Sequence, residues 1–466
     1  MNSGPDDELI DGYLPLSGGE HEREDRAALR RVAGLSTELT DVTEVEYRQV
    51  RLEQVVLIGV WTQGTLADAE RSLAELARLA ETAGSIVLEG VIQRRDRPDA
   101  ATYIGSGKAR EVHEIVIATG ADTVICDGEL TPGQLRQLEE VVKVKVVDRT
   151  WLILDIFAQH ARSREGKAQV SLAQLQYMLP RLRGWGEALS RQAGGIGTRG
   201  PGETKIETDR RRIRDQMARL RKELAAMSTA RETMRRQRRN SAVPSVAIVG
   251  YTNAGKSSLL NRLAGADALV EDALFATLDP TVRRAYTPAG HEYTITDTVG
   301  FVRHLPHQLV EAFRSTLEEI GAADVIIHVV DGSDEIPEEQ ISAVRGVLAD
   351  IEGVHLIPEL VVINKSDAAD PTVIDRLLRS EVDSLAVSAR SGAGLVELAA
   401  RIEHLLPRPS VTIDTLVPYA QASLVALVHQ HGEVLSEEHV ESGTRIRAFV
   451  PEWVALRLSD APSSAQ

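Results

Sequence analysis

The sequence predicts an α/β protein in which two segments of alternating strands and helices are separated by a helical hairpin and followed by a small α+β module. Two observations lead to this fold class. Apolar runs typical of buried strands alternate with helical patterns before residue 160 and again after residue 245. Between these segments, apolar residues recur every three or four positions, which is the spacing of helices that pack along one face.

The composition is that of a multidomain protein of a reducing compartment. At 466 residues the chain exceeds the size that one hydrophobic core usually supports. The only cysteine, Cys126, excludes an internal disulfide framework. The sequence has neither a basic start followed by an apolar leader nor a run of about eighteen apolar residues. We therefore expect a cytoplasmic location, without secretion or a membrane span.

The net charge of −16 is unevenly distributed. Residues 1–46 hold 12 acidic and 4 basic side chains with few bulky apolar groups, so we expect a disordered acidic tail. Residues 181–240 hold 17 Arg or Lys against 7 Asp or Glu. This segregation is typical of an acidic body that carries one basic arm.

Residues 47–160 predict a small parallel α/β domain. The stretch YIGSGKAREV within it contains glycines and a lysine, but a phosphate loop would require a glycine at Thr102 and a hydroxyl at Ala109. We expect a surface turn that starts a helix there, with a weak ATP site as the alternative. The predicted strands are residues 55–61, 85–92, 123–127 and 144–148.

Residues 161–243 predict two antiparallel helices with a glycine-rich loop at their tip. The loop, GGIGTRGPG, runs from Gly194 to Gly202. The basic stretch RETMRRQRRNSAVP, with Pro244 as a helix breaker, is expected to be a linker. The periodic apolar residues are Val170, Leu172, Leu175, Met178, Leu179 and Leu182 in the first helix and Ile206, Ile213, Met217, Leu220, Leu224 and Met227 in the second.

Residues 244–407 begin with a strand, a glycine-rich loop and a helix, in the order that a phosphate-binding loop requires. Backbone N–H groups of such a loop converge on phosphate oxygens, Lys256 can reach the β and γ phosphates, and Ser257 can ligate Mg²⁺. The predicted loop residues are Gly250, Tyr251, Thr252, Asn253, Ala254, Gly255, Lys256, Ser257 and Ser258.

Two later segments have the pattern of a guanine reader. In VVINKSD, the carboxylate of Asp367 can accept two hydrogen bonds from the guanine edge, which adenine does not offer. Lys365 would lie along the base plane, and the SAR stretch would close over the purine with its backbone N–H groups. The predicted residues are Asn364, Lys365, Ser366, Asp367, Ser388, Ala389 and Arg390.

Two segments between these can sense the γ-phosphate. ITDTVG places Asp297 at a strand end, where it can hold Mg²⁺ through water, and Gly300 where its N–H can meet the phosphate. LFATLDPT supplies Thr277 as the hydroxyl that completes the Mg²⁺ shell, with Thr281 as the alternative. Lys256, Thr277 and Gly300 are the predicted catalytic residues. The remaining predicted nucleotide contacts are Phe275, Ala276, Leu278, Asp279, Thr298 and Val299.

The set GYTNAGKS, FATLD, DTVG, NKSD and SAR resembles translation-factor-class GTPases, and with GGIGTRGPGETKIETDRRR it closely resembles the HflX family. The resemblance covers about residues 50–407 and implies a P-loop GTPase domain preceded by a small α/β domain and a helical hairpin. It implies GTP or GDP and the large ribosomal subunit with its rRNA as partners, and a glycine-rich region that reaches toward the peptidyl-transferase centre. Asn253 resembles an asparagine that helps to coordinate K⁺ in some such GTPases. Residues 408–466 are the predicted α+β module, and their sequence contains no motif that indicates a chemical function.

The residue after Gly300 indicates slow hydrolysis by the free protein. Ras-like enzymes carry a glutamine there that orients the attacking water, whereas this chain has Phe301, which cannot bond water. His304 and His307 are expected in a mobile segment that does not contact the water. A partner that orders this segment would stimulate the reaction, and the ribosome is the candidate.

We expect the glycine-rich stretch to bind the phosphates of a polynucleotide, because the phosphate loop already binds those of GTP. The alternative is that its charges merely solvate a helical hairpin. The predicted RNA-binding residues are Gly194, Gly195, Gly197, Arg199, Gly200, Gly202, Lys205, Arg210, Arg211, Arg212 and Arg214.

We predict a Mg²⁺-dependent GTPase that binds the large ribosomal subunit and dissociates or rescues stalled ribosomes, without binding membrane or DNA. The alternatives are a large-subunit assembly factor and an RNA-binding or remodelling module in which hydrolysis is incidental.

Overall fold

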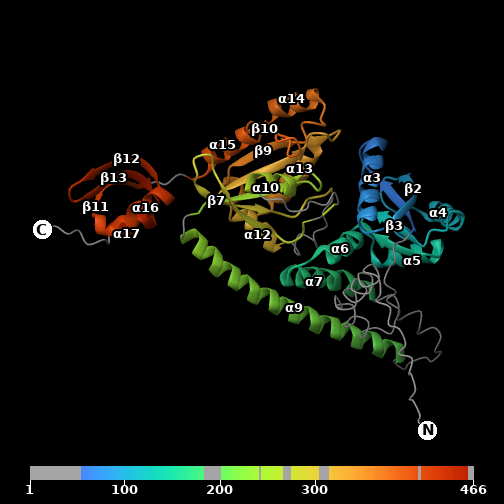
Figure 1. Cartoon of the computed structure of the whole chain (residues 1–466). Coiled ribbons are helices and arrows are strands. Elements are labelled where there is room, and N and C mark those ends of the chain that lie inside the picture. Colours follow the sequence, from blue (N-terminus) through green and yellow to red (C-terminus); the bar gives the residue numbers. More distant parts are fainter. Residues whose placement is uncertain are drawn as a thin grey trace, which may run out of the picture.

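The computed structural model describes residues 54–182, 201–240, 243–265, 274–275, 277–303, 314–407 and 411–459, and for parts of some helices, residues 201–206 and 229–240 among them, the backbone alone. The predicted acidic tail therefore lies outside the described residues, and the domain boundaries given above stay predictions. Figure 1 shows two α/β bodies next to each other, one long helix running below both, and a small module at the C-terminal end.

The N-terminal body, residues 54–160, is built on a parallel sheet with the strand order β2-β1-β3-β4. Its strands are β1 (Gln54–Trp61), β2 (Ile86–Arg94), β3 (Thr123–Asp127) and β4 (Lys145–Asp148). Its helices are α3 (Leu66–Thr82), α4 (Ser106–Thr119), α5 (Pro132–Val142) and α6 (Arg149–His160). The prediction of a parallel α/β fold is confirmed.

Residues of β1 alternate between two cores, because successive side chains of a strand point to opposite faces. Val55 and Leu57 pack with α3 and α6, whereas Val56 and Ile58 pack with α4 and α5. Helix α4 starts at Ser106, with Gly105 of YIGSGKAREV as its N-cap. Gly107 and Lys108 therefore lie within its first turn.

The hairpin consists of α7 (Arg164–Arg181) and α9 (Pro201–Asn240), which pack antiparallel. Leu175 of α7 contacts Ile213 and Met217 of α9 in a small buried cluster. Arg164, at the start of α7, forms an ion pair of 2.6 Å with Glu223, which lies further along α9. The start of α7 thus lies beside a later part of α9 than the end of α7 does, as in an antiparallel pair.

Helix α9 is longer at both ends than the sequence indicated. It begins at Pro201, so Pro201 and Gly202, the last two residues of the predicted loop, lie in its first turn. It continues to Asn240, so the basic stretch expected to be a linker is helical. The physical reasons are that proline favours the first helical position and that no glycine or proline follows Gly202 before Pro244.

The second body (residues 243–407), which holds the predicted GTPase domain and is called the G domain below, contains a six-stranded sheet of order β10-β9-β8-β5-β7-β6. In this sheet only the edge strand β6 is antiparallel. Its strands are β5 (Ser245–Gly250), β6 (Thr281–Tyr286), β7 (Glu292–Asp297), β8 (Val325–Asp331), β9 (Glu359–Asn364) and β10 (Ser384–Ala386). Its helices are α10 (Lys256–Ala264), α12 (Arg314–Gly321), α13 (Pro337–Ala349), α14 (Pro371–Ser380) and α15 (Leu395–Leu405), with the short η2 (Val354–Leu356).

One hydrophobic core continues from the N-terminal body into the G domain. It joins residues of α3 and α6 to Leu274, Phe275 and Leu278, and to α12 and α13 beneath the six-stranded sheet. The ring of Phe157 in α6 meets the ring of Phe275 edge to face, with centroids 4.6 Å apart. Such aromatic pairs stabilise beyond the area that they bury. Helices α10 and α15 pack on the opposite face of the sheet.

The C-terminal module is an antiparallel sheet of order β11-β13-β12 covered by two helices. Its elements are β11 (Val411–Val417), η3 (Tyr419–Gln421), α16 (Ala422–His431), β12 (Glu433–Val440), β13 (Gly443–Val450) and α17 (Glu452–Ser459). The α+β prediction is confirmed, although the sequence did not reveal β12 or α17. Within the described residues, every helix is too short or too polar to cross a membrane.

A buried ion network holds α6 to the rest of the N-terminal body. Arg149, only 3% exposed, bonds the carboxylates of Glu75 in α3 and of Asp127 at the end of β3, the latter at 2.7 Å. Ser72 also donates to Asp127, at 2.6 Å. The buried carboxylate of Glu75 and the largely buried carboxylate of Asp127 thus share one buried guanidinium.

Replacing Arg149 by methionine leaves both carboxylates buried without their cation, and we expect a loss of about 3–5 kcal/mol in the free energy of unfolding. Urea unfolding followed by tryptophan fluorescence measures it, since Trp151 lies two residues away. The matched control is Arg345→Met, which removes ion pairs with Glu359 and Glu381 from a side chain that is 40% exposed. It should cost less than about 1 kcal/mol. Equal losses in the two variants would contradict the role of burial.

Candidate nucleotide-binding site

The carboxyl ends of β5, β7, β8 and β9 meet at one edge of the parallel sheet, where open α/β sheets bind their ligands. The loop after β5 leads directly into α10, as predicted from the glycine spacing. Lys256, the first residue of α10, is buried and donates to the carbonyl oxygen of Tyr251 over 2.8 Å. Burial lowers the pKa of the Lys256 ammonium to about 8, and nearby Asp297 opposes that shift.

Three of the predicted residues meet next to this loop. Ser257 Oγ lies 2.6 Å from Asp297 Oδ2 and 3.0 Å from Thr277 Oγ1, and Thr277 Oγ1 lies 3.2 Å from the same carboxylate oxygen. The alternative hydroxyl, Thr281, is exposed on β6. The geometry therefore places Thr277, and not Thr281, beside the other two, while its role as a ligand stays a prediction.

This cluster fits Mg²⁺ by its donor chemistry. Mg²⁺ prefers hard oxygen ligands, and the cluster offers two hydroxyls and one carboxylate. Asp297 Oδ1 is buried and has no hydrogen-bond partner among the described residues. Burial raises the pKa of the Asp297 carboxyl, while Lys256 and the two hydroxyls act against that rise. A cation held there would satisfy the remaining oxygen.

The chain after β7 pairs with the phosphate loop. The N–H of Phe301 donates to Gly250 O over 3.1 Å, and the N–H of Thr252 donates to Phe301 O over 2.8 Å. Gly300 lies so close that a Cβ on it would stand 2.9 Å from Thr252 Cα. The ring of Phe301 is buried in the core shared with the N-terminal body, away from bulk water.

The guanine-reading segments are held together mainly by their own side chains. Asn364 donates to Ala254 O over 2.8 Å and accepts from Ala389 N over 3.0 Å, so its amide joins the phosphate loop to the SAR stretch. Asp367 accepts from Ser388 Oγ over 2.6 Å, and this hydrogen bond keeps the pKa of the Asp367 carboxyl below its ordinary value. Asn364 thus braces two loops of the site, and its contact with the nucleotide stays a prediction.

Two supporting residues were not identified from the sequence. Asp331, at the end of β8, pairs with Lys365 at 2.6 Å. Arg262 of α10 donates to the backbone carbonyls of Ala389 and Arg390, at 2.8 and 2.7 Å. Neither belongs to a local motif, because each acts on a segment far away in the chain.

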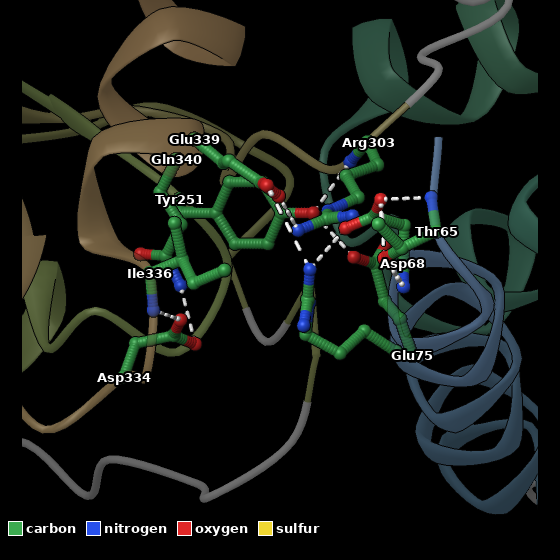
Figure 2. A network of polar contacts seen from close by, with 10 residues as sticks. Thr65, Asp68, Glu75, Tyr251, Arg303, Asp334, Ile336, Glu339 and Gln340 are labelled. Carbon is green, nitrogen blue, oxygen red and sulfur yellow. Dashed lines mark hydrogen bonds and ion pairs between the residues drawn. The ribbon is translucent and has the colours of Figure 1, made fainter. Parts of the chain in front are cut away.

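Tyr251 points away from the phosphate loop and into a polar network with the N-terminal body, as Figure 2 shows. Its hydroxyl donates to Glu75 of α3 and accepts from the backbone N–H of Arg303 at 2.6 Å. Arg303 also pairs with Glu339 of α13, which lies 3.8 Å from Arg71 of α3. Burial, followed by the charge of Glu75, raises the pKa of the Tyr251 phenol. Because the side chain of Tyr251 is engaged in this network, only its backbone is left to contact a nucleotide.

Asp279 also differs from expectation. Its carboxylate contacts the backbone of Arg162 and Ser163 at the start of α7, so it faces the hairpin and not the phosphate loop. Ala276 lies outside the described residues, while Phe275 and Leu278 are buried in the shared core. Thr298 is buried and donates to Ile248 O over 2.7 Å.

The predicted RNA-binding residues are described only in part. Arg211, Arg212 and Arg214 are exposed on α9, and Arg210 is half-buried. Arg212 lies 3.8 Å from Asp209. Gly202 and Lys205 are placed by backbone alone. Outside the described residues lie Gly194, Gly195, Gly197, Arg199 and Gly200, as well as His304 and His307.

Family models match three consecutive parts of the chain. One described as "GTP-binding GTPase N-terminal" matches residues 70–158, and one described as "GTP-binding GTPase Middle Region" matches residues 160–238. A third, described as "50S ribosome-binding GTPase", matches residues 245–365.

Relatives named GTPase HflX match most of the chain. One from Lacrimispora saccharolytica is 46% identical over 424 residues, covering 91% of this chain and 98% of the relative. One from Escherichia coli is 42% identical over 411 residues, covering 87% and 95%. A solved GTP-binding protein from Sulfolobus solfataricus in complex with GDP is 27% identical, with a TM-score of 0.40, and covers 76% of this chain and 98% of that protein. By these matches, the chain belongs to the HflX family of ribosome-associated GTPases.

Proposed function

We propose that this GTPase uses Mg²⁺ at the cluster of Ser257, Thr277 and Asp297, and that its nucleotide state controls how the hairpin docks on the rRNA of the large ribosomal subunit. In this role the protein dissociates or rescues stalled ribosomes. The observation that carries the proposal is that both γ-phosphate-sensing segments pack on the N-terminal body from which the hairpin extends.

The hydrolytic step follows from the charges around the phosphate loop. The Lys256 ammonium donates to a neutral carbonyl, and the β and γ phosphates offer charged acceptors that bind it more strongly. In this proposal the Gly300 N–H donates to the γ-phosphate. Mg²⁺ would be held by Ser257, Thr277 and Asp297, and it would supply positive charge that neutralises the phosphate charge developing in the reaction. Water then attacks the γ-phosphorus in line, and GDP leaves.

The free protein lacks a described side chain that orients this water. Phe301 occupies the position after Gly300, and its ring is buried. We infer that positioning of the nucleophile depends on a partner, which restricts the geometry of the attacking water. The exposed arginines of α9 supply positive charge for rRNA phosphates, which supports the large subunit as that partner.

We expect isolated large subunits to raise the GTP hydrolysis rate about 100-fold or more, because docking fixes the position of the attacking water. Phosphate release with and without subunits measures the effect. Lys256→Ala is the control and should release no phosphate in either tube. Equal wild-type rates in the two tubes would contradict the proposal.

Sedimentation of joined ribosomes tests the cellular role. With GTP, the protein should convert joined ribosomes into subunits, and with GDP it should not, because only one nucleotide state favours docking. Binding to the large subunit without any conversion would favour an assembly factor. Binding that is unchanged in Lys256→Ala would favour an RNA-binding module in which hydrolysis is incidental.

We expect Asp367→Asn to exchange guanine for xanthine specificity. The asparagine amide accepts only one of the two guanine hydrogen bonds, but it can donate to the extra carbonyl of xanthine. GTP affinity should fall about 100-fold or more, and XTP affinity should rise. Competition against a fluorescent GDP analogue measures both. Asp370→Asn, three residues away at the N-cap of α14, is the matched control and should leave the preference for GTP unchanged.

A further inference from the structure

A carboxylate from the G domain is bound at the start of the hairpin. Asp279 Oδ2 accepts the N–H groups of Arg162 and Ser163, at 2.9 and 2.6 Å. Asp279 Oδ1 accepts the hydroxyl of Ser163. Ser163 is the N-cap of α7, and its Oγ accepts the N–H of Gly166 at 2.8 Å. A continuous chain of hydrogen bonds thus joins Asp279 to the first turn of α7, where the helix dipole also favours negative charge.

Asp279 cannot move independently of Thr277. The two residues are separated by one, Leu278, which is 5% exposed and packed in the shared core. Phe275, on the other side, has a φ of 59° and is held against Phe157. A bulky residue keeps such a backbone conformation only when its surroundings enforce it. Because the segment is fixed at Phe275, Leu278 and Asp279, the Thr277 hydroxyl is held at the Ser257–Asp297 cluster.

The helix leaves room for this carboxylate at one position. Gly166 lies in the first turn of α7, and a Cβ built on it would overlap Asp279 Oδ1. Glycine inside a helix is intrinsically less favourable than alanine. Gly166 therefore serves the close approach of Asp279 and not the helix itself.

The far end of α7 is anchored as well. Arg181 donates to Leu130 O over 2.7 Å, lies 3.3 Å from Asp148 Oδ2, and stacks on the ring of Tyr177. Helix α7 is thus held to the Thr277 segment at its start and to the N-terminal body at its end, immediately before the glycine-rich stretch.

We propose that Asp279 is a positioning residue for Thr277: by binding the N-terminus of α7, it holds Thr277 where Mg²⁺·GTP needs it and ties the placement of the hairpin to the triphosphate. Both halves rest on the proposed function: the first on its Mg²⁺ cluster, and the second on docking of the hairpin to the large subunit. The coupling is reciprocal, so a change at α7 must alter the affinity for the triphosphate, whose Mg²⁺ shell uses Thr277, and not for GDP.

The first test measures the affinities of the full chain for GDP and for a slowly hydrolysed GTP analogue, both with Mg²⁺. Asp279→Ala and Ser163→Ala should weaken binding of the GTP analogue roughly tenfold and leave GDP binding unchanged. Ser163 is informative because it lies 116 residues away from Asp279. The control is Thr131→Ala, which removes the N-cap of α5 in the same body without contacting the G domain, and it should change neither affinity.

Gly166→Ala separates positioning from simple loss of stability. The added methyl group favours the helix but displaces Asp279, so the melting temperature with GDP should not fall, while the affinity for the GTP analogue should fall roughly tenfold. A structural role alone predicts that stability and affinity change together. Wild-type ratios of the two affinities in both Gly166→Ala and Asp279→Ala would overturn the proposal.

Hydrogen exchange of the amides of Gly166 and Lys167 reports on the helix directly. In the wild type, the GTP analogue should slow their exchange relative to GDP, and in Asp279→Ala this difference should vanish. Equal exchange in both states of the wild type would also overturn the proposal. The proposed function is tested separately, by binding of the wild type to large subunits. Equal binding with GTP and with GDP would contradict it, independently of the nucleotide affinities of these variants.

Discussion

The edge-to-face contact between Phe157 and Phe275 lies within the core on which the rest of this molecule depends. Leu274, Phe275 and Leu278 belong to the segment that carries Thr277, yet they are buried among side chains of the N-terminal body. Exposing those groups would cost the transfer free energy of three large apolar side chains. The site is therefore shaped by both α/β bodies, although its motifs all lie in one of them.

Charge balance in this buried interface is the second constraint. Arg149 compensates Glu75 and Asp127, and Glu75 in turn accepts the hydroxyl of Tyr251 from the phosphate loop. A buried charge without a partner is costly, so each of these groups restrains the position of the next. The loop that holds phosphate is thereby connected through one phenol to α3 and α6.

Side chains within the nucleotide motifs serve two purposes. Asn364 and Ser388 brace neighbouring loops, so that backbone N–H groups are presented in a fixed arrangement. Lys256, Asp297 and Thr277 retain groups that a nucleotide and its cation can use. Preorganised donors of this kind need little rearrangement when charge develops in the reaction.

Local spacing was sufficient to predict the strands, the loop that leads into α10 and the turn that follows β9. Gly250, Asp297 and Asp367 follow buried strands, and parallel strands bring their carboxyl ends together whatever the connections between them. The helical period likewise predicted that α7 and α9 would pack on each other, through Leu175, Ile213 and Met217.

The tertiary structure alone decided where the side chains of Tyr251 and Asp279 point. Tyr251 reaches Glu75 across 176 residues, and Asp279 reaches Ser163 across 116. A periodic pattern reports that a position is buried or polar, but it does not identify the distant group that covers it. That choice is made only when the two bodies pack and each buried polar atom must find a partner.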